Sequence, residues 1–134
     1  MRLLLDTHIA FWAAARPQTL TEAERAAMSA PDVLLVLSAV SVWELRLKWR
    51  SLHASGLRQG PIDPAAMIGF ANRLAWELLP LTAQHAAASL VPQLSHRDPF
   101  DELLLAQAQE EGMRLLTRDA KLINHPLAIG RASG

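Results

Sequence analysis

Five acidic residues lie where the sequence predicts that a strand ends or a helix begins. If the fold brings them together, their carboxylates repel one another unless a divalent cation lies among them. All-oxygen ligands favour Mg²⁺ or Mn²⁺ over zinc, and such a cation keeps coordination positions open for water, whose pKa it lowers. The candidate metal ligands are Asp6, Glu44, Asp98, Asp101 and Asp119.

Helix capping is the alternative explanation for each acid taken singly. Asp98 precedes Pro99, a typical helix start, so capping explains Asp98 better than metal binding does. Ser41 and Glu44 have the spacing of a capping box. Capping therefore explains Glu44 as well as metal binding does, and the same holds for Asp119.

For Asp6 and Asp101, the sequence favours a functional role over helix capping. Asp6 directly follows the apolar run Arg2–Leu5, and Asp101 lies three residues after Asp98, on the same face of a helix. Capping does not require that acids from different elements gather at one edge of a sheet. The metal hypothesis therefore depends on the whole set.

Short apolar runs alternate along the chain with segments that carry helix start and stop signals. The apolar runs predict buried strands, and the capped segments predict helices. The predicted strands are Arg2–Leu5, Val33–Leu37, Glu77–Leu81, Met113–Leu116 and Leu127–Ile129. The predicted helices start at Thr7 (ending before Pro17), Thr21 (to Ser29), Ser41 (to Leu52), Pro64 (through Leu74), Thr82 (through Ala88), Asp98 (to Glu111) and Asp119 (to Ile123), with a loop at Ser55–Pro64.

This alternation predicts the α/β class. Right-handed crossovers between strands produce a parallel sheet that helices cover on both faces. We expect a three-layer α/β/α domain over residues 1–134, with a central parallel sheet of about four to five strands. Function in such sheets gathers at the carboxyl ends of the strands, where the five acids are expected.

Composition excludes several classes of protein. The 134 residues have no net formal charge, and 51% are hydrophobic, which excludes an intrinsically disordered chain. The chain has no cysteine, which excludes disulfides, thiolate zinc sites and a Cys nucleophile. No apolar run approaches the ~18 residues of a membrane span or resembles a signal peptide, so we expect a cytoplasmic protein without membrane contact.

Four motifs occur in an order that resembles the PIN-domain family, specifically the ribonuclease toxins of VapBC-type toxin–antitoxin pairs. The similarity extends from Arg2 to about Ile129 and is most specific in the third motif. The motifs are LLLDTH at 3–8, SVWEL at 41–45, HRDPFD at 96–101 with LLAQA at 104–108, and LTRD at 116–119.

The resemblance implies an endoribonuclease dependent on Mg²⁺ or Mn²⁺ that leaves 5′-phosphate and 3′-hydroxyl ends. It assigns the catalytic, metal-holding set to Asp6, Glu44, Asp101 and Asp119, with Asp98 as a further ligand, an indirect contributor or a cap. It also implies a VapB-type antitoxin, whose C-terminal segment lies in a groove of the toxin and blocks its site, and a homodimer. The alternative is a PIN-like module with weak catalysis that binds RNA or protein.

Two hydroxyls and several basic residues complete the candidate site. Thr7 and Thr117 each lie near an acid and either orient carboxylates and water or cap helices. Trp43 is expected in the core, whereas Trp12 and Trp49 are alternatives for core or partner contacts. The chain departs from the family at Glu102, where relatives often carry Arg, and this puts an RNA contact there in doubt.

Once the five acids bind metal, 13 basic residues face 8 acidic ones, a surplus that suits a polyanionic substrate. Arg97 and Arg118 flank site acids and are candidates for substrate phosphate, and Lys48 lies where relatives often carry Lys. A basic stretch fits either phosphate contacts or, as is commoner for such a pattern, a solvated helix face; it comprises Arg46, Lys48, Arg50, His53 and Arg58.

Overall fold

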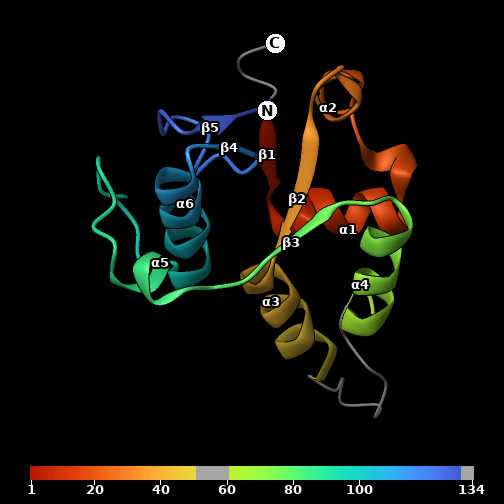
Figure 1. The fold of residues 1–134 in the computed structure, drawn as a ribbon, viewed down its shortest axis with the longest axis horizontal. Coiled ribbons are helices and arrows are strands. Elements are labelled where there is room, and N and C mark those ends of the chain that lie inside the picture. The colour runs from red at the N-terminus through yellow and green to blue at the C-terminus, as the bar shows by residue number, and fades with distance from the viewer. Residues whose placement is uncertain (51–60, 131–134) are drawn as a thin grey trace.

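The computed structural model describes residues 1–50 and 61–130 and contains a five-stranded sheet (Figure 1). The strand order is β3-β2-β1-β4-β5, and every neighbouring pair is parallel. The strands are β1 (Arg2–Leu5), β2 (Leu34–Ser38), β3 (Glu77–Leu79), β4 (Arg114–Leu116) and β5 (Ala128–Ile129). The predicted parallel sheet is confirmed.

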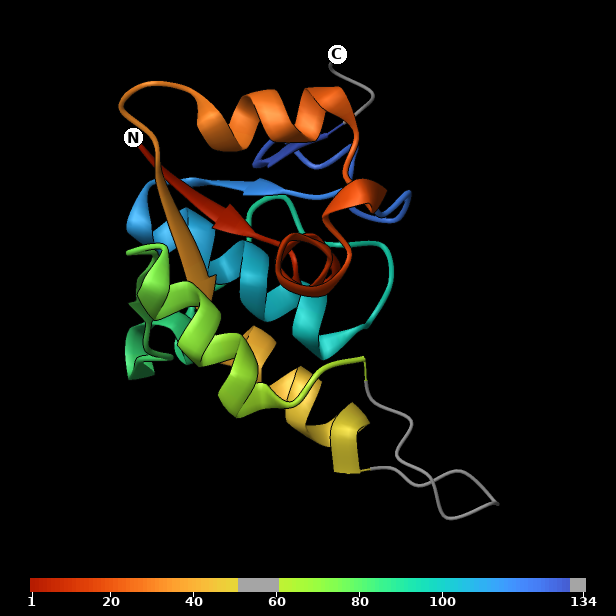
Figure 2. The ribbon, with the colours of Figure 1, turned by 90° about the vertical axis from the view of Figure 1, so that its right-hand side faces the viewer.

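Helices cover both faces of the sheet. In Figure 1, α5 and α6 lie on one side of the strands, and Figure 2 shows α1, α2 and α4 on the other. The helices are α1 (Thr7–Ala15), α2 (Glu22–Ser29), α3 (Ala39–Arg50), α4 (Pro64–Arg73), α5 (Ala83–Ala87) and α6 (Pro99–Glu111), with a 3₁₀ turn at Pro17–Thr19. The three-layer α/β/α class is therefore confirmed.

The central strand β1 supplies both hydrophobic cores because alternate side chains point to opposite faces. Leu4 packs with the buried leucines of α6, whereas Leu3 and Leu5 pack with Ile9 of α1 and with buried residues of α4. A strand buried on both faces explains why this segment reads as an uninterrupted apolar run.

Local start and stop signals place several helices as predicted. Thr21 and Glu24 form a capping box at the start of α2, with both reciprocal hydrogen bonds present. Asp98 is the N-cap of α6 and precedes Pro99, the first helical residue. Gly112 ends that helix with φ of 66°, a left-handed conformation that glycine adopts without steric cost.

Two predicted helices are wrong in detail. Helix α3 begins at Ala39, because Ser38 Oγ accepts the Val40 amide hydrogen and starts the helix earlier than predicted. Ser41 is thus inside the helix, and the predicted Ser41–Glu44 capping box is wrong. Residues 119–123 form turns, not a helix.

The third strand ends at Leu79 and not at Leu81, because Pro80 has no amide hydrogen for a ladder. Most of the predicted loop at Ser55–Pro64 lies outside the described residues, as do His53 and Arg58. Across the described ranges, no helix combines the length and the apolar character needed to cross a bilayer.

Candidate functional site

Asp6 leaves the central strand at its carboxyl end and caps helix α1. Its Oδ1 accepts the Thr7 amide hydrogen at 2.8 Å, and its own amide donates to Leu116 O at 3.0 Å. Only 6% of the residue is exposed, and burial raises the pKa of its carboxyl while hydrogen bonds from Thr117 and Thr7 lower it. Asp6 therefore caps α1 and also presents a buried carboxyl at the carboxyl edge of the sheet.

Thr117 connects Asp6 with the segment after β4. Its hydroxyl donates to Asp6 Oδ2 at 2.6 Å and accepts the Asp119 amide hydrogen at 3.0 Å. Asp6 and Asp119 line the same cavity of about 280 Å³, whose other walls are His8, Ile9, Trp12 and Arg118. The acids that follow β1 and β4 therefore border one space, as expected from adjacent parallel strands.

Glu44 reaches this edge of the sheet from α3 and is held by a hydroxyl of α1. Thr7 Oγ1 donates to Glu44 Oε1 at 2.8 Å and lies 2.9 Å from Ser41 Oγ. Lys48, one turn further along α3, contacts Glu44 Oε2 at 3.0 Å. Glu44 is thus anchored by side chains, and the structure offers it no helix-capping role.

The first turn of α6 supplies the other two acids. Asp98 Oδ1 accepts the amide hydrogens of Phe100 and Asp101, at 2.9 and 3.3 Å, so Asp98 fixes the start of the helix. Asp101 is nearly buried, with 9% exposed, and its Oδ2 lies 3.7 Å from Nε2 of His96.

Asp101 is the electrostatic centre of this acidic edge, a name we use for Asp6, Glu44, Asp98, Asp101 and Asp119. Burial together with repulsion from the other four carboxylates raises the pKa of Asp101 to about 7. Repulsion of this kind requires that the acids of β1, α3, α6 and the turn after β4 converge. A divalent cation would relieve it, and the all-oxygen donors suit Mg²⁺ or Mn²⁺.

In this structure the five carboxylates of the acidic edge are too far apart to coordinate one ion together. Across residues 1–50 and 61–130, no group of three or more acidic or imidazole side chains is arranged to hold a metal. Hydrogen bonds within the protein explain the spread, since Asp98 faces the helix start and Glu44 faces Thr7 and Lys48. The donor chemistry fits a hard cation, and binding would require these carboxylates to turn inward.

The three basic residues predicted to contact substrate differ in how many contacts they make within the protein. Arg118 donates to the buried Glu24 carboxylate and to Thr19 O, and its guanidinium lies 4.2 Å from the ring centre of Trp12. Its Nε and Nη2 donors are therefore used within the fold, whereas Nη1 has no hydrogen-bond partner in the described ranges and leaves the predicted phosphate contact open. Lys48 pairs with Glu44, whereas Arg97 is exposed and has no ion pair within the described ranges.

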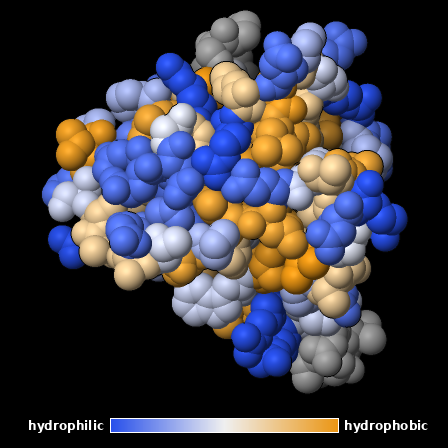
Figure 3. Space-filling view, viewed as in Figure 1, coloured by the Kyte–Doolittle hydropathy of each residue, from blue (hydrophilic) through white to orange (hydrophobic). Residues whose placement is uncertain are grey.

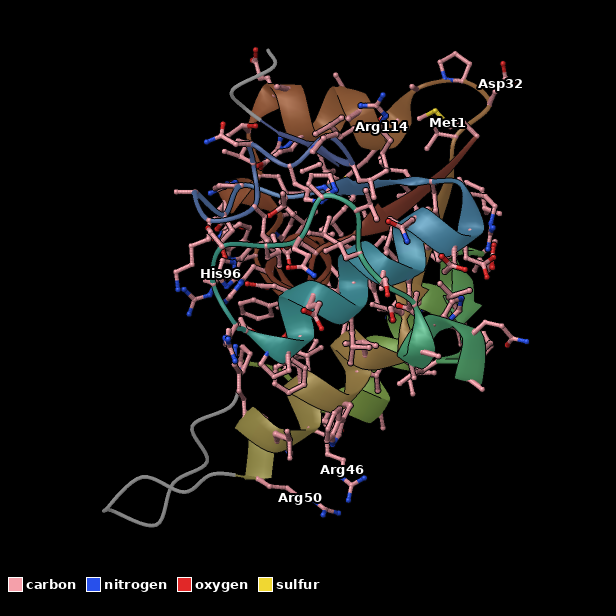
Figure 4. All side chains as sticks on the ribbon, turned by 90° about the vertical axis from the view of Figure 1, so that its left-hand side faces the viewer. Met1, Asp32, Arg46, Arg50, His96 and Arg114 are labelled. Carbon is pink, nitrogen blue, oxygen red and sulfur yellow. The ribbon has the colours of Figure 1, made fainter. Side chains whose placement is uncertain are left out.

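Two residues of the basic stretch project away from the sheet. Figure 4 shows Arg46 and Arg50 pointing outward from α3, and both are exposed. His53 and Arg58 lie outside the described residues, so the structure bears only on the α3 part of the stretch.

Sequence reasoning missed a buried polar link between the end of β2 and α6. Ser38 Oγ donates to Gln107 Oε1, and Gln107 Nε2 contacts Pro80 O and His85 Nδ1. Because Ser38 Oγ also accepts the Val40 amide hydrogen, the link joins the start of the helix that carries Glu44 to the helix that carries Asp101. A glutamine within the apolar run of α6 is the signal that could have revealed it.

Trp43 is not in the core, contrary to the prediction. It is 47% exposed, meets Phe100 edge to face at 5.3 Å, and borders a groove of about 550 Å³ between α3, α4 and β3. Trp12 and Trp49 are only partly exposed. Helix α3 starts two residues earlier than predicted, and Trp43 lies on an exposed part of its surface.

Comparisons with known proteins identify relatives of this chain. A family model described as PIN domain matches residues 3–126. Ribonuclease VapC22 of Mycobacterium tuberculosis is 31% identical over 137 aligned residues, which cover 92% of this chain and 91% of that protein.

Solved structures share the fold at low identity. VapBC2 from Rickettsia felis, bound to a DNA fragment from its promoter, superposes with a TM-score of 0.67 at 18% identity over 97% of both chains. DNA-bound VapBC from Salmonella typhimurium gives 0.60 at 16%, over 97% of this chain and 96% of that one. A toxin–antitoxin complex from Klebsiella pneumoniae gives 0.61 at 15%, over 95% of both.

Proposed function

The chain belongs to the PIN-domain family and groups with its VapC-type members, and from this membership we propose that it is a metal-dependent endoribonuclease, the toxin of a toxin–antitoxin pair. The observation that carries the proposal is that Asp6 and Asp119 border one cavity at the edge of the sheet, where Thr117 holds Asp6 and Thr7 holds Glu44, because carboxylates gathered at one edge suit a divalent cation. We place its activity in the cytoplasm, where RNA is available.

Asp6, Glu44, Asp101 and Asp119 would hold the Mg²⁺ or Mn²⁺, and Asp98 either joins them or only caps α6. A cation held there would lower the pKa of a water molecule for in-line attack on a phosphodiester and would neutralise developing charge, and the products would carry 5′-phosphate and 3′-hydroxyl ends.

The chain's own hydroxyls orient the acids for this task. Thr117 donates to Asp6, and Thr7 donates to Glu44, so each carboxylate is held in one direction. Hydrogen bonds to ligands commonly matter nearly as much as the ligands themselves. Asp101 must lose its proton to bind the cation, and a pKa of about 7 places that loss near neutral pH.

A binding module with weak catalysis is the second candidate. The presence of all five acids at the edge of the sheet favours the nuclease, since a module that only binds has no use for mutually repelling carboxylates. Metal binding and turnover distinguish the two candidates, because their folds are identical.

We propose a VapB-type antitoxin as the protein partner and the α3–α4–β3 groove as its contact surface. Figure 3 shows hydrophobic side chains gathered over β3 and neighbouring α4, where Leu78 is exposed and Ile68 and Trp43 line the groove. Helix α3 borders the groove and also carries Glu44, so an antitoxin segment there would lie close to the acidic edge. We also propose that the toxin forms homodimers.

The decisive experiment is cleavage of a mixed cellular RNA pool by the purified protein. We expect cuts with Mg²⁺ or Mn²⁺ that disappear with chelator and in Asp6→Ala. The metal alone should raise the melting temperature of the wild type more than that of Asp101→Asn. Absence of both cleavage and a metal response would overturn the proposal and leave capping as the explanation of these acids.

A further inference from the structure

A second, polar cavity lies beside the first turn of α6. It has a volume of about 610 Å³ and lies between the segment before α6 and the helix itself. This volume is within the range of about 300–1,000 Å³ that is typical of small-molecule sites. Its polar walls include Ser89, Gln93, Ser95, His96, Arg97 and Glu102.

This cavity adjoins the acidic edge. Asp98 lines it, and His96 stands between it and Asp101, with Nε2 3.7 Å from Asp101 Oδ2. Figure 4 shows His96 on the segment that leads into α6, well away from Met1 and Asp32 at the amino ends of the strands. A polymer whose phosphate lies at the acidic edge can therefore place a neighbouring residue in this cavity.

We propose that the cavity binds an unpaired guanine base of the RNA substrate, next to the scissile phosphate, and that Glu102 recognises it. The inference rests on the proposed ribonuclease function and adds a sequence preference to it.

Glu102 is the feature that points to a base. Its carboxylate is exposed on the cavity wall and has no ion pair in the described part of the chain. A free carboxylate repels the phosphates of RNA, so its favourable contact with RNA must come from neutral N–H or O–H donors. The ribose 2′-hydroxyl offers a single O–H donor, whereas adjacent N–H donors that can meet both oxygens of a carboxylate lie on the exposed edges of unpaired bases.

Guanine is the base whose edge matches a carboxylate. Its N1–H and N2–H₂ donors are adjacent and parallel, so they can donate to both oxygens of Glu102 at once. Adenine and cytosine present one amino group beside an acceptor nitrogen, which would face the second oxygen without a proton. Uracil presents one N–H between two carbonyls. The carboxylate therefore selects guanine by pairing and by repulsion.

Other groups of the cavity complete the recognition. Arg97 is exposed at the cavity without an ion pair in the described ranges, so it is available for the phosphate of the bound nucleotide. His96 Nε2 is buried and lacks a hydrogen-bond partner in the described structure, which leaves one polar atom of the shared wall unsatisfied. Ser89, Ser95 and Gln93 offer hydroxyl and amide groups to the remaining base edge.

Binding of short RNAs in chelator tests the preference without cleavage. The probes are uridine heptamers with a central guanosine, inosine, adenosine or cytidine, and inosine keeps N1–H but lacks the N2 amino group. We expect guanosine to bind roughly tenfold more tightly than adenosine or cytidine, with inosine in between, as for a bidentate base contact. Equal affinities, or no binding to any heptamer, would overturn the inference.

Glu102→Gln and Glu110→Gln form a matched pair on one helix, because each removes one exposed negative charge. Both are expected to strengthen RNA binding in general, so the ratio of guanosine to adenosine affinity is the readout. That ratio should fall to about one in Glu102→Gln and stay at roughly ten in Glu110→Gln. An unchanged ratio in Glu102→Gln would remove Glu102 from the assignment.

The two proposals fail in different ways. Metal-dependent cleavage without guanine preference would overturn this inference and leave the nuclease intact. Guanine preference without any metal-dependent cleavage would overturn the nuclease and leave a guanine-binding module. When both hold, mapped cuts should lie next to guanines, and this bias should weaken in Glu102→Gln.

Discussion

Thr117 and Asp6 are 111 residues apart in the chain, yet the threonine hydroxyl donates to the aspartate at 2.6 Å. The same hydroxyl accepts the Asp119 amide hydrogen, so one oxygen sets the positions of two acids of the acidic edge. Neighbouring parallel strands make this possible, because β1 and β4 end side by side.

Thr117→Val should therefore lower RNA cleavage by about 10- to 100-fold, the usual cost of removing a hydrogen bond to a metal ligand. Valine keeps the shape but cannot donate to Asp6, whose pKa the lost hydrogen bond had lowered. Mn²⁺ titration of the cleavage rate measures the effect. Thr117→Ser retains the hydroxyl and should recover most of the activity; equal loss in both variants would contradict a role for this hydrogen bond.

Asp101→Asn should stabilise the metal-free protein at pH 8 while abolishing cleavage. Burial and, after it, four other carboxylates raise the pKa of the wild-type carboxyl to about 7, so its ionisation at pH 8 costs about 1–3 kcal/mol. Urea unfolding in chelator measures the free energy of unfolding. Glu110→Gln, an exposed change on the same helix, should stay within about 0.5 kcal/mol of wild type; a destabilised Asp101→Asn would show that the acids do not repel.

The same raised pKa predicts how the stability of the metal-free protein depends on pH. Because folding raises the pKa of Asp101, its contribution to stability is present in full below about pH 4 and is lost as pH rises through about 7. Between pH 6 and pH 8 the metal-free wild type should lose stability relative to Asp101→Asn. Saturating Mg²⁺ should reduce that loss, and cleavage should rise over the same interval. Parallel pH profiles of the two proteins in chelator would refute the assignment to Asp101.

Arg118→Ala should destabilise the protein by about 2–4 kcal/mol, because it leaves the buried Glu24 carboxylate without its partner. Glu24 is 1% exposed, and the Arg118 guanidinium lowers the pKa of its carboxyl. Urea unfolding at pH 7 measures the loss. Arg97→Ala provides the comparison: its stability should match wild type within about 0.5 kcal/mol, while its RNA affinity should fall and depend less steeply on salt. A stable Arg118→Ala with weakened RNA binding would instead support the phosphate role predicted from sequence.

The sequence by itself indicated a parallel sheet, most helix limits and the acids of the candidate site. Leu3, Leu4 and Leu5 are all apolar because both faces of β1 are buried there. The limits of α6 are set by local residues, namely Asp98, Pro99 and Gly112. Such signals depend on neighbours within a few positions, so they can be read without the fold. Their weakness appears at α3, where Ser38 starts the helix that Ser41 was expected to start.

Only the tertiary structure decided what surrounds each side chain. Glu24 is distant in sequence from Arg118 but accepts hydrogen bonds from its guanidinium. Trp43 lies on the surface beside Phe100 instead of in the core. The raised pKa of Asp101 likewise arises from its burial, and from Asp6, Asp119 and Glu44 on other segments in addition to neighbouring Asp98. Contacts between distant segments depend on how the layers pack, and local patterns contain no record of that packing.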